Sequence, residues 1–419
     1  MKILHTVHSA NPIGGGVIEA INQLSAAHQR QGHTVQIASL DSPNAPWIHS
    51  SPVRVWALGR GRGGYSYEGR FHKWIRQHCA DFDIVVVNGL WQYSSSGVWR
   101  AMRNVNTPYV VFPHGMLDPW FNTASPRKYI KKMLFWRLIE SRVLRDASLT
   151  LFTSEEERIL ARKSFQPYSC VEAVANLGTA VPKGNPADQR KAFYAKFPNL
   201  IGKRIILFLG RLHEKKGCDL AISAFARLQD EIKVNDGTLH LVMAGPGGDS
   251  EYGEVLKRME AQKFGSRRSD VTWAGMLAGE EKWGAYRAAD AFILPSHQEN
   301  FGLAVVEALA CGLPVLISKR VNIWCEIARS RAGLVSNDDF EGTFDLLSRW
   351  EKMSEQARDE MRLAAHACYA ANFEINKAAS RLAELLQEIA NDDGNNHHAR
   401  LNIAETTSNN RSRCSKPTA

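Results

Sequence analysis

The sequence predicts an α/β protein with two doubly wound domains, each a parallel sheet covered by helices on both faces. Short runs rich in β-branched residues alternate with segments whose apolar residues recur at helical spacing, a pattern typical of parallel strands joined by right-handed crossovers. This alternation occurs twice, and a stretch with three prolines at residues 182–198 separates the two halves. The length of 419 residues, 44% of them hydrophobic, suits two domains better than one.

Several of the predicted strands lack polar alternation, as expected for strands that are buried on both faces. In the first half of the chain they are residues 2–8, 34–40, 53–58, 84–89, 109–113 and 149–153, and in the second half residues 205–209, 239–244, 271–273, 291–294, 314–317 and 333–335. Predicted helices between them include residues 17–31, 218–228, 280–289 and 304–310.

These patterns place the two domains at residues 1–183 and 200–370, joined by a linker at 184–199. A helix-forming segment follows at 371–390, and it either closes the second domain or packs back onto the first. Residues 391–419 are polar and without periodicity, which predicts a disordered tail. Doubly wound sheets bind ligands beyond the carboxyl ends of their strands, so we expect a substrate cleft between two facing domains.

Composition and charge exclude several classes of protein. The chain is not collagen-like, wholly disordered or a disulfide scaffold, and a net charge of +9 is modest for its length. Its seven cysteines show no pair at zinc or redox spacing, which predicts reduced thiols in a cytosolic protein. The N-terminus does not resemble a secretory signal, and no apolar run approaches the roughly 18 residues of a membrane span. We therefore expect a cytoplasmic protein, soluble or peripheral to a membrane, with no metal and no cofactor.

The most informative segment is LPSHQENFGLAVVE at residues 294–307. A buried strand ends there, a polar loop follows, and a helix begins near Phe301. The free amides at the start of that helix form an anion site. Glu299 and Glu307 flank this helix start, where carboxylates are suited to holding sugar hydroxyls on either side of a diphosphate. The alternative is a capping Glu299 and a solvated Glu307.

A second candidate site is LGRLHEKKG at residues 209–217, directly after a predicted strand. Arg211 offers a planar guanidinium and Lys216 a compact charge, two complementary ways to hold phosphate oxygens. An ordinary exposed basic loop is the alternative.

A third candidate is the glycine-rich turn NPIGGGV at residues 11–17, where the backbone can approach a ligand closely. Further on, Gly59, Gly61 and Gly64 match the dinucleotide fingerprint G-x-G-x-x-G. We discount this match, because arginines and polar residues surround it and no amphipathic helix begins at Gly64. A mobile basic loop is the better interpretation.

These three sites together resemble one family, the retaining, nucleotide-sugar-dependent glycosyltransferases of family 4. The same landmarks occur in the same order: the Gly-Gly turn, a strand ending in His-Gly (YVVFPHG), the GR…KKG loop, an AGPG turn, a strand ending in WAG and the E-x7-E motif ENFGLAVVE. The resemblance covers about residues 1–388. It implies the GT-B architecture, in which an N-terminal Rossmann-like acceptor domain faces a C-terminal Rossmann-like nucleotide-sugar domain across a cleft.

The resemblance also implies roles for the residues around the donor diphosphate. Arg211 and Lys216 would neutralise the diphosphate without a divalent cation. Amides of Phe301, Gly302 and Leu303 would assist them.

Other residues would contact the rest of the donor. Glu307 would bind the nucleotide ribose, and Glu299 the hydroxyls of the transferred sugar. Backbone near Met276 would meet the nucleobase. Gly15 and Gly16 would face the diphosphate from the other domain.

In the same family resemblance, His114 would contact the sugar or a reacting hydroxyl. Related chains often carry a histidine where this sequence has Asn88 in IVVVNGLW. An asparagine cannot act as a base. Retention in the family is usually explained by front-face attack, in which the departing phosphate accepts the proton, so no dedicated protein base is needed.

The segment at residues 126–146, PRKYIKKMLFWRLIESRVLRD, holds seven Lys/Arg against two acids. On a helix, six of the seven cations fall within an arc of roughly 140°. Such a basic face with interleaved aromatics suits an anionic membrane surface, which would be contacted by Lys128, Lys131 and Lys132. An ordinary helix with a solvated basic rim is the alternative.

The resemblance thus implies transfer of a hexose from a UDP- or GDP-sugar to a saccharide acceptor. The family resemblance adds a lipid-linked acceptor and bacterial exopolysaccharide or lipopolysaccharide assembly. One alternative is a sugar-nucleotide epimerase of the same architecture, which would isomerise the donor without an acceptor. A nucleic-acid-binding protein is disfavoured, because the sequence contains no recognition module.

Overall fold

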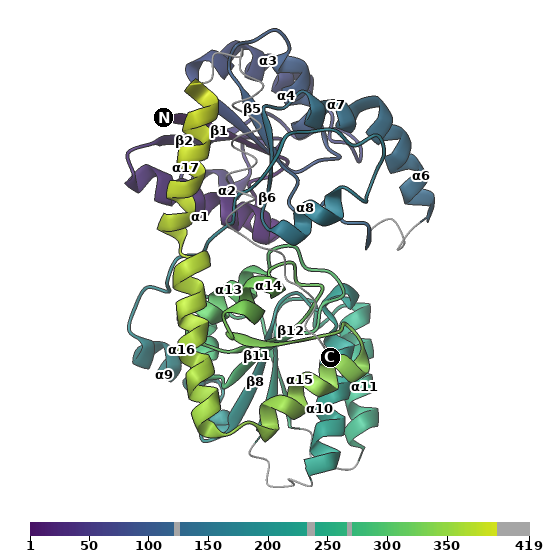
Figure 1. The fold of residues 1–419 in the computed structure, drawn as a ribbon, viewed down its shortest axis with the longest axis vertical. Coiled ribbons are helices and arrows are strands. Elements are labelled where there is room, and N and C mark those ends of the chain that lie inside the picture. Colours follow the sequence, from purple (N-terminus) through teal and green to yellow (C-terminus); the bar gives the residue numbers. More distant parts are fainter. Residues whose placement is uncertain (121–125, 233–238, 266–269, 392–419) are drawn as a thin grey trace. The chain divides into compact units, whose positions relative to one another are not determined.

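The computed structural model describes residues 1–120, 126–232, 239–265 and 270–391. The chain divides into two compact units, which Figure 1 shows as ribbons. Unit 1 comprises Met1–Gly178 and the C-terminal segment that begins at Ile375, and unit 2 comprises Thr179–Glu374. Both units are α/β, so the predicted fold class is confirmed.

Unit 1 contains a seven-stranded parallel sheet with strand order β3-β2-β1-β4-β5-β6-β7. The strands are β1 (Lys2–Val7), β2 (Thr34–Ser39), β3 (Arg54–Ala57), β4 (Ile84–Asn88), β5 (Tyr109–Phe112), β6 (Leu149–Phe152) and β7 (Glu172–Val174). The helices are α1 (Gly16–Arg30), α2 (Pro46–His49), α3 (Gly69–His78), α4 (Tyr93–Met102), α6 (Pro126–Phe135), α7 (Ser141–Arg145), α8 (Glu155–Ala161) and α17 (Ile375–Asn391), with short turns η1 (Pro12–Gly14), η2 (Cys79–Asp81) and the π-helical η3 (Trp136–Glu140). Every residue of β4, β5 and β6 is buried, which explains their continuous apolar sequences.

Unit 2 contains a six-stranded parallel sheet with strand order β10-β9-β8-β11-β12-β13. The strands are β8 (Arg204–Leu209), β9 (Leu239–Ala244), β10 (Val271–Gly275), β11 (Ala291–Leu294), β12 (Val315–Ser318) and β13 (Gly333–Ser336). The helices are α9 (Pro186–Lys196), α10 (Cys218–Ile232), α11 (Glu251–Phe264), α12 (Gly279–Ala288), α13 (Leu303–Ala310), α14 (Trp324–Arg329), α15 (Phe340–Lys352) and α16 (Glu355–Asn372), with short turns η4 (Pro198–Leu200) and η5 (Glu214–Lys216).

Strand order reverses between β1 and β4 in unit 1 and between β8 and β11 in unit 2. At such a switch point the two loops leaving the neighbouring strands run in opposite directions, and a crevice opens between them at the carboxyl edge. The predicted site residues follow these four strands or lie near them. The topology of each sheet therefore positions the candidate chemistry.

The C-terminal helix α17 packs on α1, and Figure 1 shows the two side by side. His28 Nε2 donates to the Ala379 carbonyl oxygen at 2.9 Å, and Gln31 Nε2 donates to Ser380 Oγ at 2.9 Å. Of the two alternatives for this helix, the structure shows the return to the N-terminal unit. Apart from Asn391, the predicted tail at 391–419 lies outside the described residues.

The prediction of a linker at residues 184–199 is wrong. Asn185 Oδ1 accepts a hydrogen bond from the Ala187 amide at 2.8 Å and so caps α9, whose first residue is Pro186. An N–H group in the first turn of a helix has no partner within the helix, so proline, which lacks this group, fits there. Pro186 therefore starts α9 and does not break it. The helix α9 packs on α12, where a Cβ at Gly284 would lie 2.1 Å from the Gln189 carbonyl oxygen. This segment is part of unit 2, which begins at Thr179 and ends at Glu374.

None of the described helices combines the length and the apolar character needed to cross a membrane.

Candidate active site

The loops that follow β8 and β11 lie together at the switch point of unit 2. His297 N donates to the Lys215 carbonyl oxygen at 2.8 Å, which ties one loop to the other. Gly217 has φ +64°, and a Cβ there would lie 2.3 Å from the Pro295 carbonyl oxygen. Only glycine tolerates both this backbone conformation and this close approach. The predicted basic loop therefore lies against the loop that carries Glu299.

Lys216 and Glu299 form an ion pair between these loops, with Lys216 Nζ donating to Glu299 Oε2. Their side chains are only 17% and 16% exposed. Burial lowers the pKa of the Lys216 ammonium, and the neighbouring cations of Lys215 and Arg211 lower it further. The resulting pKa is about 7, even with the Glu299 carboxylate in contact with the amine. The Lys216 amine is thus partly buried, and its counter-ion in the described structure is the single carboxylate of Glu299.

The N-terminus of α13 lies beside this ion pair. Gly302, with φ +71°, precedes the helix, and a Cβ there would lie 3.3 Å from Glu299 Cγ. The amides of Phe301, Gly302 and Leu303 donate to no other described residue. Free amides at the start of a helix attract an anion, and an anion there would also lie near Lys216.

Arg211 and Met276 are exposed at the carboxyl edge of the same sheet, after β8 and β10, and Met276 is 69% exposed. The turn after β9 holds these loops close together. Gly245 N donates to the Gly275 carbonyl oxygen at 2.7 Å, and a Cβ on Gly245 would lie 1.9 Å from the Gly210 carbonyl oxygen. Backbone packing therefore brings the AGPG turn against the GR loop, while both predicted side chains remain accessible.

Glu307 is buried, and its side chain is 4% exposed. Lys282 Nζ donates to Glu307 Oε1 at 2.6 Å, and the Tyr286 hydroxyl donates to Oε2 at 3.0 Å. Burial, followed by the Glu307 charge, raises the pKa of the Tyr286 phenol well above its ordinary value. The alternative of a solvated Glu307 is wrong, because both carboxylate oxygens face polar groups of α12. The predicted contact of Glu307 with a ribose stays a prediction.

In unit 1, Asn88 at the end of β4 orients His114 in the loop after β5. Asn88 Nδ2 lies 3.2 Å from the Thr6 carbonyl oxygen and 3.1 Å from the Val86 carbonyl oxygen. These carbonyls only accept, so the amide nitrogen must face them. Asn88 Oδ1 then faces His114 Nε2 at 3.0 Å and accepts its proton. The bond assigns the proton of neutral His114 to Nε2 and leaves Nδ1 as an acceptor.

Burial lowers the pKa of His114 to about 4, so the ring is neutral near pH 7. His5, whose Nδ1 lies 3.2 Å from Asn88 Nδ2, has its pKa lowered to about 3, mainly by burial and then by His28 and His114. A neutral His114 can accept a hydrogen bond from a hydroxyl at Nδ1. It cannot act near pH 7 as an imidazolium acid.

The glycine turn after β1 is open. Gly15 has φ +86° and precedes α1. A Cβ on Gly16 would meet nothing within 4 Å. This backbone is therefore accessible to a ligand, and its contact with a diphosphate stays a prediction.

Comparison with known proteins identifies the family. A model described as "Glycosyl transferase 4-like domain" matches residues 15–176, and one described as "Glycosyl transferases group 1" matches residues 190–366. The chain belongs to the GT-B glycosyltransferases. The two matches fall on unit 1 and unit 2 respectively.

Relatives and solved structures agree with this family. D-inositol 3-phosphate glycosyltransferase of Corynebacterium jeikeium is 28% identical over 289 residues, which are 65% of this chain and 67% of that protein. Sucrose-phosphate synthase of Thermosynechococcus elongatus superimposes with a TM-score of 0.73 at 20% identity, covering 93% of this chain and 98% of that one. HepE of Anabaena, solved with UDP and glucose, gives a TM-score of 0.73 at 18% identity, covering 92% and 99%. The two structures support the fold alone.

Sequence reasoning missed the carboxylate of Glu157, which supports the loop that carries His114 and Gly115. Glu157 accepts hydrogen bonds from Gly115 N at 2.5 Å and from Thr153 N at 2.7 Å, and so ties the loop after β5 to the end of β6. The spacing of Ser154 and Glu157 matches a capping box, and Ser154 Oγ does accept from Glu157 N at 3.1 Å. That signal predicts a helix start, but it does not reveal the bond to Gly115.

The basic segment of the glycosyltransferase forms α6, η3 and α7. Lys131 is exposed, whereas Lys132 Nζ lies 4.8 Å from the centre of the Trp91 ring and is partly covered. The Lys128 side chain lies outside the described residues. Beside these cations, the apolar side chains of Ile130 and Leu134 are 63% and 61% exposed. The exposed face is therefore more apolar than the charge pattern predicts.

Within the described ranges of the glycosyltransferase, no three His, Cys, Asp or Glu side chains gather in an arrangement that could hold a metal ion.

Proposed function

We propose that this glycosyltransferase moves a hexose from a nucleoside-diphosphate sugar to a saccharide acceptor, with retention of the anomeric configuration and without a divalent cation. The acceptor is lipid-linked, and the reaction belongs to polysaccharide assembly at the inner face of a bacterial membrane. The donor part rests on unit 2 and the membrane part on α6.

One observation carries the donor assignment. The Lys216–Glu299 ion pair lies beside the free amides that precede α13, at the switch point of unit 2. A diphosphate placed before the helix would meet these amides and the Lys216 ammonium, with the Arg211 guanidinium nearby. HepE, which has the same fold, was solved with UDP, and its ligand fits the same chemistry.

The transfer breaks the bond between the sugar C1 and the diphosphate oxygen and forms a bond between C1 and an acceptor hydroxyl on the same face. The hydroxyl proton passes to an oxygen of the departing diphosphate. Lys216 and the α13 amides stabilise the charge that develops on this leaving group, so they act most strongly in the transition state. Glu299, once Lys216 turns to the diphosphate, is free to accept hydrogen bonds from the sugar hydroxyls.

Three measurements test the donor assignment. A thermal-shift screen of nucleotide sugars identifies the donor. NMR of the product then reports its anomeric configuration, and the rate is measured with and without EDTA. Inversion, or activity lost in EDTA and restored by magnesium, would overturn retention or metal independence respectively. Conversion of donor alone into an isomer would favour the epimerase alternative.

The membrane assignment rests on the exposed face of α6 and η3. Ile130, Leu134 and Leu138 follow one another at four-residue spacing, share one helix face, and are 63%, 61% and 54% exposed. Lys131 and Arg137 are exposed on the same elements. Apolar side chains flanked by cations suit the interface of an anionic bilayer.

Co-sedimentation with anionic vesicles tests this surface. Replacing Lys128, Lys131 and Lys132 together by Glu should abolish binding, and Ile130→Ser with Leu134→Ser should weaken it strongly at unchanged charge. Leu363→Ser is a matched control, because Leu363 is 75% exposed on α16 in unit 2. Equal binding by all of these variants would exclude α6 as the membrane contact.

A further inference from the structure

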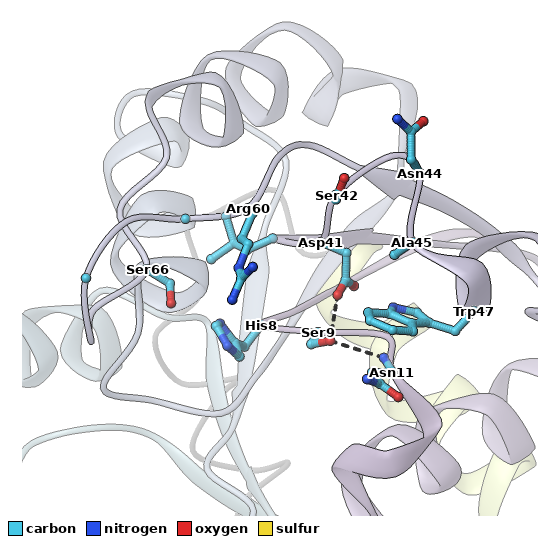
Figure 2. A pocket seen from close by; sticks show the side chains of 13 residues that line it. His8, Ser9, Asn11, Asp41, Ser42, Asn44, Ala45, Trp47, Arg60 and Ser66 are labelled. Carbon is cyan, nitrogen blue, oxygen red and sulfur yellow. Dashed lines mark hydrogen bonds between the residues drawn. The ribbon is translucent and has the colours of Figure 1, made fainter.

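Unit 1 contains a cavity of about 690 Å³ that neither the donor assignment nor His114 uses. Three loops form its walls, at residues 8–11 after β1, 40–47 after β2 and 60–66 after β3. Figure 2 shows the side chains that line it. It lies at the carboxyl edge of the sheet, where doubly wound folds bind ligands, and its volume is within the usual range of about 300–1,000 Å³ for small-molecule sites.

The buried carboxylate of Asp41 forms one wall. Asp41 Oδ1 accepts from Ser9 Oγ at 2.6 Å, and Oδ2 accepts from Ala10 N at 2.7 Å. These two bonds fix the carboxylate but occupy only about half of its acceptor capacity, so each oxygen can take one more hydrogen bond. A carboxylate after the second strand of such a sheet is well placed to accept from neighbouring sugar hydroxyls.

Two more polar groups of the cavity residues lack partners. His8 Nδ1 and Trp47 Nε1 are buried, and neither forms a hydrogen bond within the described part of the chain. Buried polar groups are nearly always paired, so these two atoms keep unused hydrogen-bonding capacity beside the cavity. Burial lowers the pKa of His8, although the Asp41 charge acts in the opposite direction, so this ring also favours its neutral form. One N–H donor and one neutral imidazole therefore supplement the carboxylate.

Arg60 adds a cation to the rim. Figure 2 shows its side chain directed toward His8. Arg60 forms no ion pair with any described residue, Asp41 included. A guanidinium on the rim that pairs with no described carboxylate suits an anionic group of the ligand, such as a carboxylate or a phosphate.

The loop that carries Arg60 is held by internal backbone hydrogen bonds. Arg62 N donates to the Tyr67 carbonyl oxygen at 2.9 Å, and Tyr67 N donates back at 3.1 Å. A Cβ on Gly61 would lie 2.1 Å from the Ser66 carbonyl oxygen, so the glycine permits the tight turn. The GRGRGG sequence thus builds a hairpin-like wall for the cavity.

We propose that this cavity binds a sugar carrying an anionic group, which serves as the acceptor residue of the transfer. This inference rests on the proposed function. The ring hydroxyls bond to Asp41, His8 and Trp47, and the carboxylate or phosphate binds Arg60. The site therefore selects charged sugars over neutral ones.

Calorimetry on the full chain tests the proposal with methyl glucuronide, glucose 6-phosphate and methyl glucoside as probes. The wild type should bind at least one of the two anionic sugars about tenfold or more tightly than the neutral one, as expected for a hydrogen bond to a charged group. The tighter of the two identifies the anion as carboxylate or phosphate. Arg60→Gln should abolish this preference, and Asp41→Asn should weaken all three probes.

Arg62→Gln is the matched control, because Arg62 is an exposed arginine of the same loop and does not line the cavity. Equal binding of charged and neutral sugars, or the same loss in Arg62→Gln as in Arg60→Gln, would overturn the proposal. Titration of UDP into the same samples tests the donor assignment in unit 2 separately from the cavity assignment in unit 1. UDP binding without sugar binding contradicts the cavity assignment alone, whereas Arg60-dependent sugar binding without any nucleotide binding contradicts the donor assignment alone.

Discussion

The carboxyl edges of the two sheets of this glycosyltransferase share a topology but not a chemistry. In unit 2 the loops after β8 and β11 bring together Lys216, Glu299 and free amides. In unit 1 the end of β4 and the loop after β5 bring together Asn88 and His114. The first arrangement is charged and suits an anion, and the second is neutral and suits a hydroxyl. The parallel sheet decides where a ligand lies, and the loop residues decide which ligand it is.

Burial lowers the pKa values of the basic groups in both places, but only at Lys216 does the value stay near 7. At Lys216 desolvation and the neighbouring cations lower the pKa to about 7, close to the working pH, so a bound diphosphate can shift the amine fully to its charged form. At His5 and His114 no carboxylate lies in hydrogen-bonding contact with either ring in the described structure, and desolvation lowers the pKa values to about 3 and 4. The experiments below test whether this difference governs catalysis and stability.

The largest effect is expected for Lys216→Ala. The variant leaves Glu299 without its cation and removes a positive charge from the leaving group, so the rate of transfer should fall by about 100-fold to 1,000-fold. Initial rates at saturating donor measure this loss. Lys257→Ala is the control, because Lys257 pairs with Glu254 on the surface of α11 and should not affect turnover. A Lys216→Ala rate near that of the wild type would contradict the charged site.

The second prediction concerns stability in acid, where the buried histidines of unit 1 are the weak point. Burial lowers the pKa of His28 to about 4, although its bond to Ala379 acts in the opposite direction. In the unfolded chain the His28 pKa is near 6.5. As the pH falls, His28 is therefore protonated in the unfolded chain at a higher pH than in the folded protein. The stability gained from a neutral His28 is complete above about pH 6.5 and is lost progressively toward pH 4, by about 1.4 kcal/mol per pH unit.

Urea unfolding at pH 7 and pH 5 measures this loss. His28→Gln should lose about 2 kcal/mol less than the wild type between the two pH values. His49→Gln, at an exposed histidine of α2, should lose as much as the wild type. The same loss in all three proteins would show that His28 does not stay neutral in the folded state.

The sequence predicted the sheets well because their strands are buried apolar runs. Twelve of the thirteen strands in the described residues were predicted within one or two residues, and β7 was missed because three residues, Glu172–Val174, are too short a pattern. The helix α9 was missed because Pro186 was interpreted as a breaker, although a proline in the first turn is compatible with a helix. Local pattern thus predicts elements well where the pattern is long.

The candidate site was predictable only in part. The GR…KKG and E-x7-E motifs identified Lys216 and Glu299, which the structure brings into contact. No local signal predicted that Lys282 would pair with Glu307, because that bond depends on how α12 packs near α13. The cavity around Asp41 is formed by three loops far apart in sequence, and its charge and shape appear only in three dimensions.

The smallest effect is expected at Asn88, where a substitution can change the His114 ring from neutral to charged. Asn88→Asp would place a carboxylate next to His114 Nε2 and raise the pKa of that ring. The imidazolium would then carry a proton on Nδ1, and it could no longer accept a hydrogen bond from a hydroxyl. We expect kcat to fall about tenfold at pH 6, equivalent to one hydrogen bond, and to recover as the pH rises.

The wild type should show no His114-dependent step between pH 6 and 8, because the pKa of its ring is about 4. Asn88→Leu, which removes the acceptor without adding charge, should lower kcat without this pH dependence. Identical pH profiles for the two variants would mean that Asn88 supports the fold and does not set the tautomer of His114.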